Sequence, residues 1–133
     1  MEYISAEEFL KQPKEVQEVF IDWWSKNKTI SDIATIKINK ERWGVHVLSD
    51  IDLVVFEIGK DLIPLLTEGQ LRKFIEDKTE GFVVINVDEE KYQYKIEIID
   101  EFADYEITMI FTGVGTDLLQ AYWKVACEIA KEG

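Results

Sequence analysis

The chain has 133 residues, which is the size of one domain. Apolar residues make up 47% of it and charged residues 32%, with 7 Gly and 2 Pro, so the disordered, collagen-like and low-complexity classes are excluded. The formal net charge of −12 disfavours direct binding to nucleic acid or to an anionic membrane, because both require a basic neutralising surface.

Cysteine usage and the start of the chain bear on the compartment. Cys127 is the single cysteine, so the chain cannot form an internal disulfide or a thiolate metal cluster. The first residues show no basic stretch followed by an apolar one, and no apolar run reaches the roughly 18 residues of a membrane span. We therefore expect a cytoplasmic protein, with residues 1–133 forming a single acidic domain.

The first half of the chain predicts two helices followed by strands. Ser5, with Glu8 three positions later, is typical of a helix start and predicts a short helix over 6–11. Pro13 suits the first turn of a second helix over 14–26, in which apolar residues recur at three- and four-residue spacing. Three segments rich in Ile and Val then predict two or three strands, at 29–39, 42–48 and 51–58.

A capping box gives the clearest local signal. Thr67 and Gln70 are spaced as such a box requires, which predicts a helix over 68–78 with Leu71, Phe74 and Ile75 facing inward. The segment 82–87 that follows is apolar on both faces, a pattern typical of a central strand.

Alternation then predicts two more strands. In 92–99, Tyr92, Tyr94, Ile96 and Ile98 alternate with polar residues, which places Glu97 on the solvated face. The same pattern returns in 105–111 and places Tyr105 on the inner side. With 82–87, these segments predict a three-stranded antiparallel meander.

The last segment predicts a helix after a glycine turn. Gly113 and Gly115 permit positive φ where the chain leaves the sheet. Thr116 or Asp117 then caps a helix over 117–131, whose spacing puts Cys127 on the flank away from the main apolar stripe. The sum is an α+β fold: a mostly antiparallel sheet that ends in the meander, with helices packed on one face.

Catalytic and metal sites have little support in the residues. A nucleophile would pair Cys127 with His46, the single histidine, but a surface histidine and a structural cysteine are the favoured interpretation. Carboxylates at 88–90 or 100–104 would suit Mg²⁺ or Ca²⁺, yet neither cluster has the spacing of a calcium loop. We expect no enzymatic activity, no metal and no cofactor.

The distribution of acidic residues is more informative. Residues 76–106 hold eleven acids and three lysines, a net charge of −8. Two of the acidic groups fall at opposite ends of the predicted strand 92–99, about 27 Å apart, and a nucleic-acid strand of that length carries roughly eight phosphates. Ordinary solubility is the alternative explanation. The candidate partner-binding residues are Asp88, Glu89, Glu90, Glu97, Asp100, Glu101 and Asp104.

Aromatic residues offer a second possible surface. Trp23 and Trp24 are adjacent on a predicted helix and point about 100° apart, so one of them is a candidate for exposure. Trp123 lies at the edge of the last helix's apolar stripe. Exposed tryptophans often anchor partners, although a place in the core is the favoured interpretation.

Three stretches resemble small uncharacterised proteins of phages and prophages of Gram-positive bacteria. They are QPKEVQEVFIDWW, LIPLLTEGQLRKFIED and DLLQAYWKVACEIAKE, about a third of the chain. The resemblance implies a mobile-element origin and no particular activity. Proteins of this kind often inhibit host enzymes, including defence nucleases such as CRISPR effectors, whose nucleic-acid channels are basic.

Three hypotheses follow. The first is an acidic, nucleic-acid-mimic-like inhibitor of a basic host protein, a class that includes anti-CRISPR and other anti-defence inhibitors. The second is a phage accessory or assembly protein that binds through exposed aromatics. The third is a carboxylate- or metal-dependent enzyme.

Overall fold

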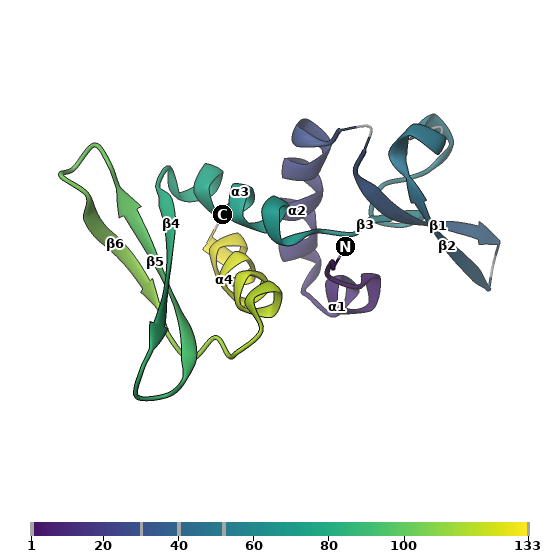
Figure 1. Cartoon of the computed structure of the whole chain (residues 1–133). Helices are drawn as coiled ribbons and strands as arrows, with labels where there is room; N and C mark the ends of the chain where they lie inside the picture. The colour runs from purple at the N-terminus through teal and green to yellow at the C-terminus, as the bar shows by residue number, and fades with distance from the viewer. Residues whose placement is uncertain (1, 30, 40, 52, 133) are drawn as a thin grey trace. The chain divides into compact units, whose positions relative to one another are not determined.

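A computed structural model describes residues 2–29, 31–39, 41–51 and 53–132 (Figure 1). Contacts divide the chain into two compact units: an amino-terminal unit of residues 3–66 and a carboxy-terminal unit that begins at Thr67 and also includes residues 1–2. That these units form the single domain expected for residues 1–133 stays a prediction.

The amino-terminal unit combines two helices with a small antiparallel sheet. Helix α1 covers Ala6–Leu10 and helix α2 covers Lys14–Asn27, in agreement with the predicted helices. The strands are β1 (Ile33–Asn39), β2 (Arg42–Val47) and β3 (Leu62–Pro64), in the order β2-β1-β3. The rings of Phe9 and Phe20 lie 6.3 Å apart and join α1 to α2.

Of the two or three strands predicted over 29–58, β1 and β2 are present, and the described part of 51–58 forms no strand; Asp52 lies outside the described residues. Leu53–Val55 forms a 3₁₀ turn. Gly59 then adopts a φ of +94°, and the Glu57 carbonyl accepts N–H groups from the residues after it, which closes a tight turn. The place beside β1 is taken instead by β3, whose three side chains are buried, and Pro64 is tolerated because β3 is an edge strand.

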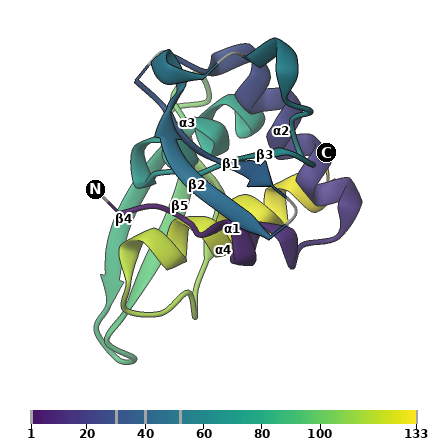
Figure 2. The same cartoon turned by 90° about the vertical axis from the view of Figure 1, so that its right-hand side faces the viewer.

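The carboxy-terminal unit contains the predicted meander and two long helices. Its elements are α3 (Glu68–Thr79), β4 (Phe82–Asp88), β5 (Gln93–Asp100), β6 (Glu106–Phe111) and α4 (Leu118–Glu132). The strands pair antiparallel in the order β4-β5-β6. Helices α3 and α4 contact each other, and they contact β4 and β5 respectively (Figures 1 and 2). The predicted α+β fold, with helices on one face of an antiparallel meander, is confirmed.

Strand β4 is an edge strand, so its predicted central position is wrong. Only one of its two apolar faces is covered by helices. Val83 is buried on that inner face, whereas Phe82 remains exposed on the other. The second apolar face of β4 therefore forms part of an apolar surface of the meander. It does not reflect a central position between two other strands.

Capping residues fix both helices of this unit. The Thr67 hydroxyl accepts a hydrogen bond from the Gln70 backbone N–H at 3.3 Å, and the Gln70 Oε1 accepts one from the Thr67 N–H at 3.0 Å, which completes the predicted capping box. Asp117 Oδ1 accepts from the Gln120 N–H at 2.9 Å at the start of α4. Gly113 and Gly115 both have positive φ, as the strand-to-helix turn requires.

Helix α4 is buried around most of its circumference. Cys127, which was expected on an exposed flank, is buried because the inward-facing set reaches beyond one stripe. Tyr122 is buried as well, and this burial raises the pKa of its hydroxyl, an effect that the nearby Arg72 guanidinium partly opposes.

The capping box and the core of α3 make a ranked stability prediction. Thr67→Ala removes one cap acceptor and is expected to cost about 1 kcal/mol of unfolding free energy. Phe74→Ala leaves a cavity at a fully buried site and is expected to cost about 3–5 kcal/mol. Urea melts of both variants measure the ranking. Equal midpoints would contradict the docking of α3 on its inward face.

Candidate interaction surface

The first acidic turn joins β4 to β5. Asp88 Oδ1 accepts hydrogen bonds from the backbone N–H groups of Glu90 at 3.1 Å and Lys91 at 3.4 Å. This local bonding shapes the turn and leaves the side chains of Glu89 and Glu90 exposed. The turn therefore presents acidic groups from an ordered backbone.

The second acidic turn joins β5 to β6, at the opposite end of β5. Asp100 Oδ1 accepts from the Phe102 N–H at 2.9 Å, while Glu101 and Asp104 are exposed. Asp104 and Tyr105 both have positive φ, which is unusual for residues other than glycine and folds the turn tightly. The prediction that the two acidic groups lie at opposite ends of one strand is confirmed.

Glu97 differs from the other six candidate residues. It lies on the sheet face away from the helices, as predicted, but only 7% of it is exposed, so its expected solvation is wrong. The reason is the register, which places Val84 and Ile110 directly opposite it on the two neighbouring strands. Its Oε1 accepts from Asn86 Nδ2 at 2.7 Å and pairs with Lys95 Nζ at 3.4 Å.

An apolar surface surrounds Glu97, and we name this the outer face of the meander. Val83, Ile96 and Ile98 are buried on the helix side, so their neighbours along each strand point the other way. Phe82 and Ile110 are exposed there, and Ile99 and Val84 are half-buried. A register shift between Ile98 and Ile99 also places the exposed Ile107 opposite Ile99, so Ile107 and Ile110 share this face although they are three positions apart on β6. Sequence reasoning missed this surface, although the two-faced apolar pattern of 82–87 was its signal.

Aromatic residues stand out at the two turns. Tyr92 and Tyr105, both predicted to point inward, are exposed residues with positive φ in the turns that precede β5 and β6. Phe102 is 90% exposed among acidic neighbours. Alternation failed at these positions because the strands begin one residue later than predicted.

The tryptophans proposed as an alternative surface are in the core. Trp23, Trp24 and Trp123 are all buried, so they cannot provide a surface contact in this structure. The remaining tryptophan, Trp43 on β2, is 40% exposed. Sequence reasoning did not single it out, because its strand gave no contrast between an inner and an outer face.

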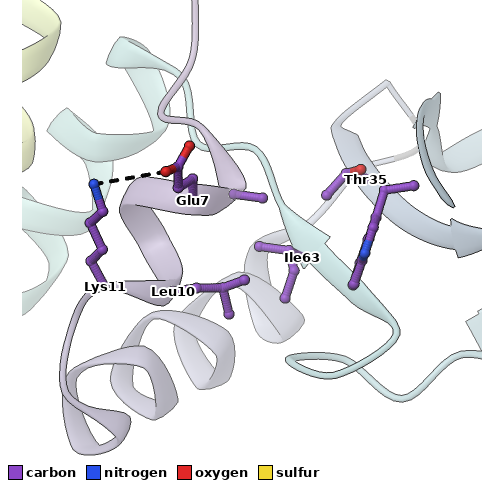
Figure 3. A pocket seen from close by; sticks show the side chains of 7 residues that line it. Glu7, Leu10, Lys11, Thr35 and Ile63 are labelled. Atoms are coloured by element: carbon purple, nitrogen blue, oxygen red, sulfur yellow. Dashed lines mark ion pairs between the residues drawn. The ribbon is translucent and has the colours of Figure 1, made fainter. Parts of the chain in front are cut away.

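Trp43 lines an apolar pocket of about 460 Å³ in the amino-terminal unit (Figure 3). Leu10 of α1, Ile63 of β3 and Thr35 of β1 line the same pocket and are labelled in Figure 3. At the rim the Glu7 carboxylate and the Lys11 amino group form an exposed ion pair at 3.9 Å. The volume lies in the range of small-molecule sites, and the lining is almost entirely apolar.

The residues considered for catalysis have separate environments. His46 is half-buried on β2, and Cys127 is buried in α4. Among the described residues, no three His, Cys, Asp or Glu side chains gather as a metal ion would require. Within the same residues, no helix combines the length and apolar character needed to cross a membrane.

Comparison with known proteins adds no relative: no family model, curated protein or solved structure matches the chain.

The contrast in tryptophan exposure gives a spectroscopic prediction. Trp43→Phe is expected to remove most of the indole emission that acrylamide quenches, because the other three tryptophans are buried. Trp123→Phe serves as the matched control and should leave the quenchable fraction intact. Steady-state quenching measures both. Unchanged quenching in Trp43→Phe would show that the pocket wall is not open to solvent.

Proposed function

We propose that this protein is an acidic, non-enzymatic interaction protein that binds and inhibits a basic host protein. The observation that carries the proposal is that six acidic residues occupy the turns at the two ends of β5, and none of them forms an ion pair within the described residues. They are Asp88, Glu89, Glu90, Asp100, Glu101 and Asp104. Four of them, Glu89, Glu90, Glu101 and Asp104, are exposed and available to a partner, whereas Asp88 and Asp100 each use Oδ1 to hold the turn.

Electrostatics supports this function over simple solubility. Among the described residues, five of the seven ion pairs join residues three or four positions apart within a helix or at its end, so most paired basic side chains lie outside the two turns. Lys91 is the one basic residue in the turns, and among the described residues it forms no ion pair with their carboxylates. Like charges held together repel, and a basic surface relieves that repulsion while it attracts the protein from a distance. The turns therefore favour fast association with a cationic partner.

The kind of partner follows from the spacing of the turns. Strand β5 has eight residues and thus separates the two turns by roughly 27 Å at about 3.4 Å per residue. Phosphates in a nucleic-acid strand recur at about 3.4 Å as well, so a basic nucleic-acid channel is a suitable acceptor for this charge. The resemblance to phage proteins supports a host nuclease, including a CRISPR effector, in the cytoplasm as the target.

Charge reversal tests the proposal. Glu89, Glu90 and Glu101 are exposed, so replacing all three by Lys changes six units of charge without disturbing the core. Glu15, Glu18 and Glu41, exposed in the amino-terminal unit, give a matched control when replaced by Lys. Capture from a host lysate at low salt, followed by association rates for the recovered partner, should show a loss for the first variant only.

Salt gives the second arm of this test. The Debye length shrinks from about 10 Å at 0.1 M salt to about 3 Å at 1 M, so the wild-type association rate should fall steeply over that range. If both triple variants bind equally and the binding does not depend on salt, the acidic turns serve solubility and the proposal is contradicted.

The pocket beside Trp43 favours a second function, which is binding through an exposed aromatic residue. Its specific observation is an exposed indole next to an apolar cavity, in the unit that lacks the acidic turns. A partner bound there should be insensitive to the charge reversals and should be lost in Trp43→Ala.

A further inference from the structure

The carboxylate of Glu97 has one oxygen committed and one available. Both of its contacts, with Asn86 Nδ2 at 2.7 Å and Lys95 Nζ at 3.4 Å, are made by Oε1. Within the described residues no donor is assigned to Oε2. The side chain is more than nine-tenths buried, but Oε2 is not one of the buried atoms that lack a partner, so it keeps some contact with water. An acceptor of this kind is suited to a donor that arrives with a partner.

The surroundings of Glu97 have the composition of an interface centre. Val84 and Ile110 flank it in the same row of the sheet, and the next row is Phe82, Ile99 and Ile107. Three of these five apolar side chains are exposed. They belong to the face of the meander away from α3 and α4, two helices that lie on the other side of the strands in Figure 1. Interfaces typically have an apolar centre inside a polar rim, and here the two acidic turns supply the rim at both ends.

We infer that the outer face of the meander is the surface on which the basic partner docks, and that a Lys or Arg side chain of the partner donates to Glu97 Oε2. This inference rests on the proposed function, because it assigns the centre of the interface whose ends are the acidic turns. The partner would present a cation surrounded by apolar side chains, with further basic residues outside them.

The partner must bring a Lys or Arg side chain because its docking removes water from the Glu97 carboxylate. When a partner covers the apolar row, Glu97 Oε2 loses its remaining contact with water, and a carboxylate oxygen left without a donor in such a site is strongly unfavourable. Lys95 compensates only in part, since its amino group contacts Oε1 and its side chain is 36% exposed. A purely apolar surface would therefore be rejected, which makes Glu97 a specificity-determining residue.

Charge also distinguishes this partner from a second copy of the chain. Two copies joined through their outer faces would each bring both acidic turns to the contact, on chains of net charge −12. They would also place two Glu97 carboxylates in one apolar layer. A basic partner surface would attract the acidic turns and would supply a donor to Glu97, so charge complementarity favours a different protein over a second copy.

Two synthetic peptides of equal charge test the inference. The first is Lys-Val-Lys-Arg-Lys-Val-Lys, whose extended form places an arginine between two valines on one face. The second has serine in place of each valine. Fluorescence anisotropy measures their affinities for the full chain, and amide chemical-shift mapping locates the bound peptide.

Three variants complete the design. Glu97→Gln keeps an oxygen for Asn86 but removes the charge, and Ile110→Ser removes an apolar side chain that is 56% exposed. Ile38→Ser is the matched control, since Ile38 is 52% exposed on β1 of the other unit. Urea melts confirm that each variant folds.

We expect the valine peptide to bind about tenfold more tightly than the serine peptide, with amide chemical-shift changes on β4, β5 and β6. Ile110→Ser and Glu97→Gln should each remove most of that advantage, and Ile38→Ser should not. Equal binding of both peptides, unaffected by these variants, would overturn the docking site and leave the acidic turns standing. Binding of neither peptide at low salt would count against the proposed function itself. A dimer lost in Ile110→Ser would assign the face to a second copy.

Discussion

Burial of Ile96 and Ile98 beneath α3 and α4 is the constraint on which the meander depends. Because side chains alternate along a strand, fixing these two residues inward fixes every other position of β5 outward or inward, and the pairing with β4 and β6 carries that choice across the sheet. A shift of one residue would place Glu97 against the helices and expose Ile96. The cost of burying that carboxylate and exposing that isoleucine excludes the shifted register.

The same register gives the outer face of the meander acidic ends and an apolar middle. Its ends are hydrophilic, since the turns need residues such as Asp88 and Asp100 whose carboxylates accept backbone N–H groups. Its middle is apolar, because β4 carries Phe82 and Val84 on the uncovered side. Glu97 joins the two regions: it is acidic like the turns, yet it is buried by its apolar neighbours. In the proposed function, the turns would attract the partner at a distance and Glu97 would select it at contact, so the two roles belong to different residues of one sheet.

The amino-terminal unit has a different character. Its sheet has the order β2-β1-β3, so β2 lies at an edge, and Trp43 on that strand is partly exposed. The surface of the pocket beside Trp43 is mostly apolar, with Thr35 among its lining residues and the ion pair of Glu7 and Lys11 at its rim. Charge plays little part in this region, in contrast to the meander. The two units therefore provide surfaces of distinct chemistry.

The sequence by itself determined the features that depend on neighbours along the chain. The four helices, the capping box at Thr67, the glycine turn before α4 and the antiparallel meander all follow from short-range spacing, because caps and periodicity act within one or two turns. The positions of the acidic turns at the two ends of β5 followed from the same local pattern.

Tertiary structure decided what depends on partners distant in the sequence. It placed β3 where 51–58 was expected, left β4 at an edge, buried Cys127 and three tryptophans, and enclosed Glu97 between Val84 and Ile110. The exposure of a residue depends on which other elements pack over it, and the local spacing of residue types does not specify that packing.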